Sequence, residues 1–248
     1  MAAAPISSAI FGATGLVGAH IVTSLLTLDA FGTVHTITRR APKQASDAVL
    51  AKKLDAVVET DTEQWVPKLN GLFTTTTAAA AAPSAVFSAL GTTRLAAGGI
   101  ANQWKIDHDL NVEIARAAKA AGVKTFVFVS SAGTRSLAAR WLPYSKMKNG
   151  VEDTIKSLGF DQAIILQPGL ILGDREVEHQ GAGPLKVLVK ATGSISQGLH
   201  DSLGQEAEVI GRAAVHAALL ASQGKAPSKY WVLDATAIVK LGRDEWKF

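Results

Sequence analysis

Residues 6–18 read Ile6-Ser-Ser-Ala-Ile-Phe11-Gly12-Ala-Thr-Gly15-Leu-Val-Gly18, an apolar run followed by three glycines at a spacing of three. An amphipathic stretch continues to about Leu26, so that strand, glycine turn and helix follow in order. The first glycine permits a tight turn, the second lets the backbone approach a pyrophosphate, and the third lets the helix pack on its strand. Unpaired N–H groups at the helix start can then hold phosphate. Glycines are common in turns, so this pattern predicts a dinucleotide site only together with the rest of the chain. The predicted phosphate-binding residues are Gly12, Thr14, Gly15, Leu16, Val17 and Gly18.

Length and composition indicate a single α/β domain of 248 residues. No apolar run approaches the ~18 residues that a membrane span requires. The segment Met1–Pro5 has no positive region typical of a signal peptide. The absence of cysteine excludes disulfides and thiolate chemistry and suits a reducing compartment, which favours a cytoplasmic location. The six histidines show no pairing at metal-ligand spacing, so we expect no metal.

The net charge of +4 raises the question of an anionic partner. The tight basic groups are Arg39-Arg40, Lys52-Lys53 and the pair Lys146 and Lys148. No basic run is interleaved with aromatic residues, and no nucleic-acid module is recognisable. A solvated surface together with an anionic cofactor accounts for the charge, and we expect no nucleic-acid partner.

The end of the second strand indicates which dinucleotide is bound. Residues 33–38 alternate and are β-branched, and they end in Arg39-Arg40. In dinucleotide folds an acidic residue at this point binds the 2′-hydroxyl of NAD, whereas arginine accommodates the 2′-phosphate of NADP. No acid occupies residues 36–42. Because a guanidinium can bind phosphate with two hydrogen bonds, Arg39 and Arg40 favour NADP(H). Asp61, after the third strand, either lies near the adenine or caps the following helix.

Apolar strands alternate with helices along the chain, which predicts a doubly wound parallel sheet. The low-complexity run Thr74–Pro83 is interpreted as a surface insertion without function. The predicted strands are 6–11, 33–38, 54–59, 85–90, 125–129 and 164–166, with 231–233 as a late strand or edge segment, and the main predicted helices are 16–26, 62 onward, 106–121, 143 onward and 206–221.

Small and hydroxyl-bearing residues follow several of these strands, at the sheet edge where such folds bind ligands. Residues 85–90 end in Leu90-Gly91-Thr92, residues 125–129 in Ser130-Ser131, and residues 164–166 in Gln167-Pro168-Gly169-Leu170. A helix starting at Pro143 places Tyr144 and Lys148 on one face, four residues apart. Such a pair is usually an exposed surface pair, so its meaning depends on the preceding motifs.

The combined pattern resembles the short-chain dehydrogenase/reductase superfamily. It rests on Gly12-x-x-Gly15-x-x-Gly18, Ser131 and Tyr144-x-x-x-Lys148, in this order on alternating strands and helices. The resemblance implies a catalytic tetrad at Asn111, Ser131, Tyr144 and Lys148, with Ser130 as the alternative serine. Glycine spacing and a short C-terminal part point to the extended or atypical branch. Segments 90–94, 130–133 and 166–173 are similar to the Tat-interacting-protein-like group, which includes a fungal family associated with the mitochondrial outer membrane.

The chemistry is consistent with these residue types. Carbonyl reduction needs a proton donor on the oxygen, and a tyrosine is a slow acid at neutral pH unless a cation stabilises its phenolate. Lys148 would supply that cation and, by the resemblance, hold the nicotinamide ribose. Ser131 would hydrogen-bond the substrate carbonyl. Asn111 would fix a water in a proton relay to Lys148, and Pro168, Gly169 and Leu170 would orient the nicotinamide amide.

The predicted function is therefore an NADPH-dependent oxidoreductase acting on a carbonyl or alcohol. Residues 173–204 and 225–248 are expected to form a small substrate-covering lobe, too short for a nucleotide sugar, which favours a small hydrophobic substrate. Arg94 is expected either to pair with the cofactor's pyrophosphate or an acidic group of the substrate, or to be an exposed surface residue. The alternative is an NADP(H)-binding regulatory or interaction module with little turnover, because fold alone does not decide function. The resemblance also implies a homodimer and peripheral attachment to mitochondria.

Overall fold

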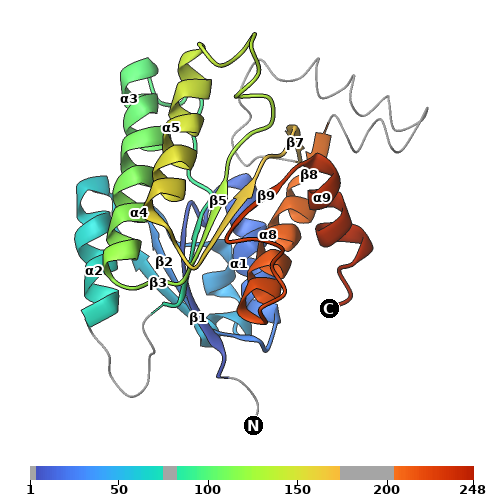
Figure 1. Ribbon diagram of the computed structural model, residues 1–248. Coiled ribbons are helices and arrows are strands. Elements are labelled where there is room, and N and C mark those ends of the chain that lie inside the picture. Colours follow the sequence, from blue (N-terminus) through green and yellow to red (C-terminus); the bar gives the residue numbers. More distant parts are fainter. Residues whose placement is uncertain (1–3, 75–82, 174–203) are drawn as a thin grey trace.

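A seven-stranded parallel sheet forms the centre of the molecule (Figure 1). The computed structural model describes residues 4–74, 83–173 and 204–248. The strand order is β3-β2-β1-β4-β5-β6-β9, and every neighbouring pair is parallel. This order confirms the predicted doubly wound α/β fold. The strands are β1 (Ile6–Phe11), β2 (Phe31–Thr38), β3 (Leu54–Val58), β4 (Ala85–Ser88), β5 (Thr125–Val129), β6 (Gln162–Leu166) and β9 (Tyr230–Leu233).

Helices cover both faces of the sheet. One face carries α2 (Trp65–Thr74), α4 (Leu110–Ala120) and α5 (Pro143–Leu158), and the other carries α1 (Leu16–Thr27), α8 (Ala207–Ser222) and α9 (Ala235–Val239). The shorter helices are η1 (Lys43–Ser46), η2 (Leu50–Lys53), η3 (Thr62–Gln64), α3 (Ile100–Trp104), and the π-helices η4 (Lys105–Asp109) and η5 (Lys240–Asp244).

Burial explains the strand pattern. All five residues of β5 are buried, as expected for a strand covered on both faces. The two helical layers form two apolar clusters, one around α1 and α8 and the other around α2, α4 and α5. The helix α8 is buried on nearly all sides because it packs against both α1 and the sheet.

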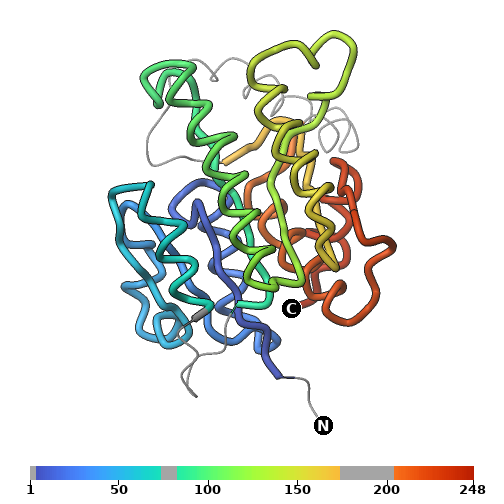
Figure 2. The backbone as a smooth tube through the Cα atoms, turned by 60° about the vertical axis from the view of Figure 1, so that its left-hand side comes forward, coloured from blue at the N-terminus to red at the C-terminus, as the bar shows by residue number. Residues whose placement is uncertain are grey.

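The chain reverses its direction of growth between β1 and β4, which are hydrogen-bonded neighbours although two strands separate them in sequence. In doubly wound sheets, ligands bind at the carboxyl end of the strands at this point. Two loops rise from this end, residues 89–99 after β4 and residues 130–142 after β5 (Figure 2). The described geometry therefore places the predicted site residues at one edge of the sheet.

Two predicted helix features differ from the structure. The helix expected from Ile106 begins earlier, as α3 at Ile100, and reaches α4 through the π-helix Lys105–Asp109. The buried residues on this segment include Gln103 and Asp107. The apolar pattern in the sequence gives no signal for such a π-turn.

The C-terminal part contributes to the main sheet. Residues 225–248 were expected in a covering lobe, but β9 pairs with β6 and forms the sheet edge. The separate two-stranded pair β7 (Leu170–Leu172) and β8 (Gly204–Glu206) flanks the gap in the described chain. Residues 174–203 of the expected lobe, and residues 75–82 of the low-complexity run, lie outside the described residues.

Candidate active site

The glycine turn has close contacts that account for two of its three glycines. Gly12 has φ of +81°, and a Cβ there would lie 2.7 Å from the backbone of Ala89. A Cβ on Gly18 would lie 2.0 Å from the Gly12 carbonyl oxygen. The turn therefore packs against the end of β4, and α1 packs against the turn, as the motif predicts.

Gly15 differs because it faces outward. A Cβ there would meet only the Gly12 carbonyl oxygen, at 3.2 Å. Gly15 is the N-cap of α1, no side chain caps this helix, and its first turn carries no acidic residue. The N–H groups at the helix start are thus open to an anion, at the positive end of the helix dipole. This open cradle fits the pyrophosphate of a dinucleotide.

The two arginines after β2 lie next to this cradle. Both are exposed, and the Arg40 guanidinium donates to the Thr14 carbonyl oxygen at 3.4 Å. The Thr38 hydroxyl donates to the Arg40 carbonyl oxygen at 2.7 Å and holds the turn. The end of β2 therefore carries two exposed arginines, of which Arg40 contacts the glycine turn.

Asp61 has a local structural role. Its carboxylate accepts a hydrogen bond from the Glu63 backbone N–H at 2.9 Å and caps η3. The Asp61 backbone N–H in turn donates to the Glu59 carboxylate, which lowers the pKa of Glu59. Of the two interpretations of Asp61, the helix cap is the contact that the described residues make.

The two serines after β5 have different surroundings. Ser130 is buried, and its hydroxyl donates to the Glu152 carboxylate on α5. Ser131 is half-buried, and the next residue, Ala132, donates its backbone N–H to the Pro168 carbonyl oxygen at 2.8 Å. The hydroxyl of Ser130 is therefore already engaged, and Ser131 is the serine that remains at the rim beside Pro168.

Glu152 is a buried carboxylate with a full set of donors. The Arg135 guanidinium donates to it at 3.1 and 3.2 Å, and the Gln167 amide at 3.1 and 3.2 Å. Arg135 also pairs with Asp153 at 2.7 Å. These contacts join the loop after β5, the end of β6 and helix α5, so that the segment carrying Ser131 is anchored on two sides.

Tyr144 and Lys148 lie one turn apart on α5, as predicted. Tyr144 is 40% exposed and Lys148 is 4% exposed, so the phenol lies near solvent and the ammonium lies inside. The Lys148 ammonium donates to the Val129 carbonyl oxygen at 3.2 Å and lies 4.9 Å from the centre of the Phe128 ring. This places a buried cation directly below the end of β5.

Gly91 connects this cation to the glycine turn. The Gly12 turn packs on the Ala89–Leu90 backbone, and a Cβ on the adjacent Gly91 would lie 3.8 Å from the Lys148 ammonium. The same Cβ would lie 3.6 Å from a carboxylate oxygen of Asp107. The phosphate cradle, the loop after β4 and the buried lysine are therefore contiguous.

Asp107 is a site residue that the sequence analysis missed. It is fully buried, and its carboxylate accepts from the Thr92 backbone N–H at 2.7 Å and from the Gln103 amide at 3.2 Å. Burial raises the pKa of Asp107, while the charge of Lys148 lowers it. The sequence does carry a signal for it, an aspartate four residues before the predicted site residue Asn111 and therefore on the same helix face.

Asn111 is engaged in the helix and in β4. Its amide donates to the carbonyl oxygens of Ile106 at 3.0 Å and Asp107 at 3.3 Å, and its own oxygen accepts from the Ser88 hydroxyl. These carbonyls belong to the π-helix, whose irregular turn frees them. Asn111 is therefore buried rather than solvated, and the polar side chain that lies toward Lys148 is Asp107.

Residues 167–170 follow β6 at the same carboxyl edge of the sheet. Pro168 is buried, and the Gly169 backbone N–H donates to the Gln205 amide oxygen at 2.7 Å. Leu170 begins β7 and is half-buried. The predicted nicotinamide-orienting residues thus lie beside Ser131 and are tied to β8.

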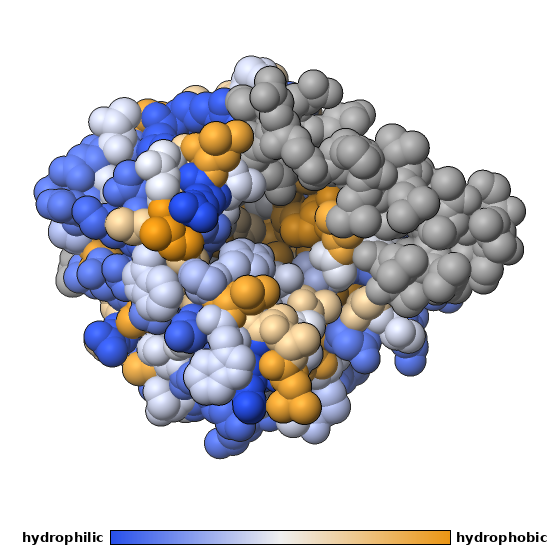
Figure 3. All heavy atoms as spheres, turned by 90° about the horizontal axis from the view of Figure 1, so that it is seen from above, coloured by the Kyte–Doolittle hydropathy of each residue, from blue (hydrophilic) through white to orange (hydrophobic). Residues whose placement is uncertain are grey.

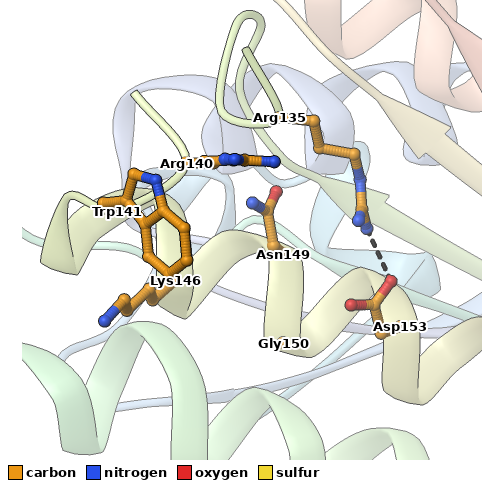
Figure 4. Close-up of a pocket in the computed structure, with 7 residues that line it drawn as sticks. All are labelled: Arg135, Arg140, Trp141, Lys146, Asn149, Gly150 and Asp153. Carbon is orange, nitrogen blue, oxygen red and sulfur yellow. Dashed lines mark hydrogen bonds and ion pairs between the residues drawn. The ribbon is translucent and has the colours of Figure 1, made fainter. Parts of the chain in front are cut away.

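A shallow groove lies on the other side of α5 (Figure 4). It has a volume of about 390 Å³, and Arg140 and Trp141 face Lys146 and Asn149 across it. Arg140 and Lys146 lie 5.0 and 5.8 Å from the Trp141 ring centre. Tyr144 and Lys148 are absent from its lining, so this groove is separate from the candidate active site.

Within the described part of the chain, no cluster of three or more potential metal ligands occurs, and no helix is long and apolar enough to span a membrane.

Comparison with known proteins assigns the family. The NAD(P)H-binding family profile matches residues 12–197. The chain is 57% identical over 242 residues to "Protein FMP52, mitochondrial" of Chaetomium globosum, covering 97% of this chain and 99% of the relative. It is 55% identical over 246 residues to "Protein fmp-52, mitochondrial" of Neurospora crassa, covering 98% of each. The chain belongs to the FMP52 family. This result confirms the predicted resemblance to short-chain dehydrogenases/reductases and its fungal subgroup.

Solved structures with the same fold include "MoeE5 in complex with UDP-glucose and NAD", at a TM-score of 0.62 and 16% identity, covering 97% of this chain and 82% of that one. The UDP-Glc/GlcNAc 4-epimerase of Campylobacter jejuni has a TM-score of 0.64 and 13% identity, covering 95% and 82%. At these identities the likeness concerns the fold alone, a Rossmann fold, and the NAD(P)H-binding assignment comes from the family profile.

Proposed function

We propose that this FMP52-family protein is an NADP(H)-dependent oxidoreductase that reduces a carbonyl, or oxidises an alcohol, through Ser131, Tyr144 and Lys148. The observation that carries the proposal is the contiguity of the glycine cradle, Gly91 and the buried Lys148 ammonium. A protein that only senses a dinucleotide needs the cradle but has no need of a buried cation beside an accessible phenol.

The proposed chemistry follows from these positions. Bound NADPH supplies the hydride. The Tyr144 hydroxyl donates a proton to the carbonyl oxygen, and the Lys148 ammonium, one helical turn below, stabilises the phenolate that remains. Ser131 donates a hydrogen bond to the same oxygen and stabilises the charge that develops there. The Ser130 hydroxyl already donates its hydrogen bond to Glu152, so Ser131 is the serine that we assign to this role.

The cofactor preference rests on the end of β2. Arg39 and Arg40 stand beside the cradle without an acidic neighbour from 36 to 42, so a 2′-phosphate is attracted where a carboxylate would repel it. We expect Arg39→Asp to reduce or reverse the preference for NADPH over NADH, whereas Arg116→Asp, a charge-matched change on α4, leaves it unaltered. Equal affinity of the natural protein for both cofactors would refute the 2′-phosphate assignment.

The test of the catalytic proposal is a panel of small carbonyl compounds assayed by NADPH absorbance, with Tyr144→Phe as the comparison. We expect turnover with at least one hydrophobic member, and we expect Tyr144→Phe to lose it while keeping NADPH affinity. Tight NADPH binding without turnover of any member would support the alternative, a regulatory module. Equal turnover by both proteins would remove Tyr144 from the reaction.

We further propose a mitochondrial location, because the close relatives are named mitochondrial proteins, with peripheral attachment to the outer membrane. The loop after β5 supports attachment: Leu137, Trp141 and Leu142 are 78%, 68% and 56% exposed. Residues 131–146 contain no Asp or Glu, and Arg140 and Lys146 flank the Trp141 ring. Exposed apolar and basic side chains together favour anionic membrane surfaces. Apolar residues also occur among polar ones around the hollow at the carboxyl edge (Figure 3).

The attachment is tested by sedimentation with vesicles containing anionic lipid. We expect Trp141→Ala combined with Leu142→Ser to reduce the bound fraction, and neutral vesicles to bind less of the natural protein. Unchanged binding of the double variant would contradict the assignment to this loop.

A further inference from the structure

We propose that Asp107 is a positioning residue of the active site: its buried carboxylate faces the Lys148 ammonium across Gly91 and holds this cation in place. The consequence for catalysis rests on the proposed function, but the pairing of Asp107 with Lys148 does not.

The first argument is burial. Asp107 is fully buried and Lys148 is 4% exposed, so neither charge is screened well by water. A buried charge without a compensating partner is costly, and opposite charges at close range attract strongly in such surroundings. Among the described residues no carboxylate oxygen lies within 4.0 Å of the Lys148 ammonium. Asp107 is the carboxylate whose charge acts on it, through the position above Gly91.

The second argument is the way in which Asp107 is held. One oxygen accepts from the Thr92 backbone N–H at 2.7 Å, and the other accepts from Gln103 at 3.2 Å. Gln103 also donates to the Thr92 carbonyl oxygen at 3.1 Å. The carboxylate is thus fixed to the loop that follows β4, and no arginine or lysine in the described part of the chain forms an ion pair with it. Its negative charge remains available to Lys148.

The third argument is the π-turn that directs Asp107 inward. A π-turn inserts an extra residue into a helix and often occurs at functional sites. Asn111 and Ser88 stabilise this turn from below, because Asn111 binds the carbonyl oxygens of Ile106 and Asp107 and receives the Ser88 hydroxyl. Two buried polar side chains therefore support a turn that places a carboxylate toward the lysine.

Gly91 keeps the space between the two charges open. A Cβ there would be in ordinary contact with both groups, at 3.6 Å from the Asp107 oxygen and 3.8 Å from the Lys148 nitrogen. With hydrogen in its place, Gly91 puts no side chain of its own next to either group. Of the other titratable groups on the π-turn, His108 and Asp109 are bonded to each other at 2.8 Å, and Lys105 is exposed. Glu152 on α5 is engaged by Arg135 and Gln167.

The pairing is tested without any substrate by carbon-13 NMR titration of aspartate carboxyls, with the Asp107 signal assigned by its loss in Asp107→Asn. Burial raises the pKa of Asp107 above the ordinary value, and the Lys148 charge opposes this rise. We expect Lys148→Met to raise the pKa of Asp107 further, whereas Lys146→Met, an exposed change on the same helix, leaves it unaltered. The same titration midpoint in the natural protein and in Lys148→Met would overturn the proposal.

The positioning role is tested by comparing Asp107→Asn with Asp109→Asn, a matched change two residues away. We expect Asp107→Asn to weaken NADPH binding and to lower kcat by about tenfold or more, because a misplaced catalytic group can cost up to ~100-fold. Asp109→Asn should leave both values unchanged. If the natural protein turns over no substrate, the proposed function fails while the NMR titration still decides the pairing. Unchanged NADPH affinity and kcat in Asp107→Asn would refute the positioning role.

Discussion

Two buried carboxylates on neighbouring helices have opposite surroundings. Glu152 on α5 receives hydrogen bonds from Ser130, Arg135 and Gln167, including a guanidinium that neutralises its charge. Asp107 on the π-helix receives one backbone N–H and one amide, and it forms no ion pair with any cation among residues 4–74, 83–173 and 204–248. Burial accordingly raises the pKa of Asp107. Glu152 joins three segments of the fold through its hydrogen bonds. The charge of Asp107, in contrast, interacts with the charge of Lys148.

A carboxylate with a structural role differs from one with a functional role in whether a cation within the protein neutralises its charge. A charge that is fully paired inside the protein stabilises the fold when intact and destabilises it when one partner is lost. A charge that is only partly compensated costs stability and is retained where a site needs it. The two residues should therefore respond differently to substitution.

The largest effect is expected for Glu152→Ala. Removing this carboxylate leaves the buried Ser130 hydroxyl without its acceptor, which costs about 1–3 kcal/mol, while the half-exposed Arg135 keeps Asp153 as a partner. Urea unfolding measures the loss. Asp153→Ala is the matched control, because Asp153 is exposed and pairs with the same arginine. A fall below ~1 kcal/mol for Glu152→Ala would contradict its role in joining the loops.

Asp107→Asn should show the opposite result to Glu152→Ala: its function should be lost while its fold stays stable. The folded-state pKa of Asp107 lies above its unfolded value, so the folded state favours the protonated form. Its unfavourable contribution is small below the unfolded pKa and grows as pH rises through the folded pKa. We expect the unfolding free energy of the variant, relative to the natural protein, to rise as the pH rises above the unfolded-state pKa of an aspartate. A difference that stays constant as the pH rises would contradict the comparison.

A smaller effect is expected for Gly91→Ala, which adds a methyl group next to Asp107 and Lys148. The added methyl meets both Asp107 and Lys148 at ordinary contact distance, so the fold should tolerate it. We expect a severalfold weaker NADPH affinity with an unfolding free energy unchanged to within ~0.5 kcal/mol. Gly71→Ala, where a Cβ meets nothing within 4 Å, serves as control. Full NADPH affinity in Gly91→Ala would show that this position is not part of the site.

The smallest expected effect is a change in the pKa of Tyr230 when the charge of Glu152 is removed. The chain has two tyrosines, Tyr144 and Tyr230. Burial, with a further contribution from Glu152, raises the pKa of Tyr230 to about 12. In Glu152→Gln the negative charge is lost, so the pKa of Tyr230 should fall. Ultraviolet absorbance during alkaline titration, with Tyr144→Phe removing the other phenol, measures this change. An unaltered Tyr230 midpoint would contradict the influence of Glu152.

The fold could be predicted from local pattern because its signals are short in range. Continuous apolar runs such as Thr125–Val129 coincide with buried strands, and the glycine turn lies where the motif places it. Residues 231–233 indicated only a late strand or edge segment, because the pairing of β9 (Tyr230–Leu233) with β6 depends on contacts distant in sequence.

The site was predicted where residue spacing alone determines geometry and was missed where the backbone is irregular. Tyr144 and Lys148 share a face because four residues make about one helical turn. Asp107 lies on the π-helix Lys105–Asp109, and its contact with the loop after β4 joins residues that are distant in sequence. The engagement of Ser130 by Glu152 likewise requires a partner 22 residues away.

The central claim, a catalytic site formed by Tyr144 and Lys148 beside the dinucleotide cradle, is tested most directly by NADPH oxidation in the presence of a carbonyl panel. The natural protein and Tyr144→Phe are compared at equal NADPH occupancy. The account expects turnover by the natural protein and a loss of at least about 100-fold in Tyr144→Phe, in line with general acid catalysis. Equal turnover by both proteins, or its absence in the natural protein despite bound NADPH, would contradict the account.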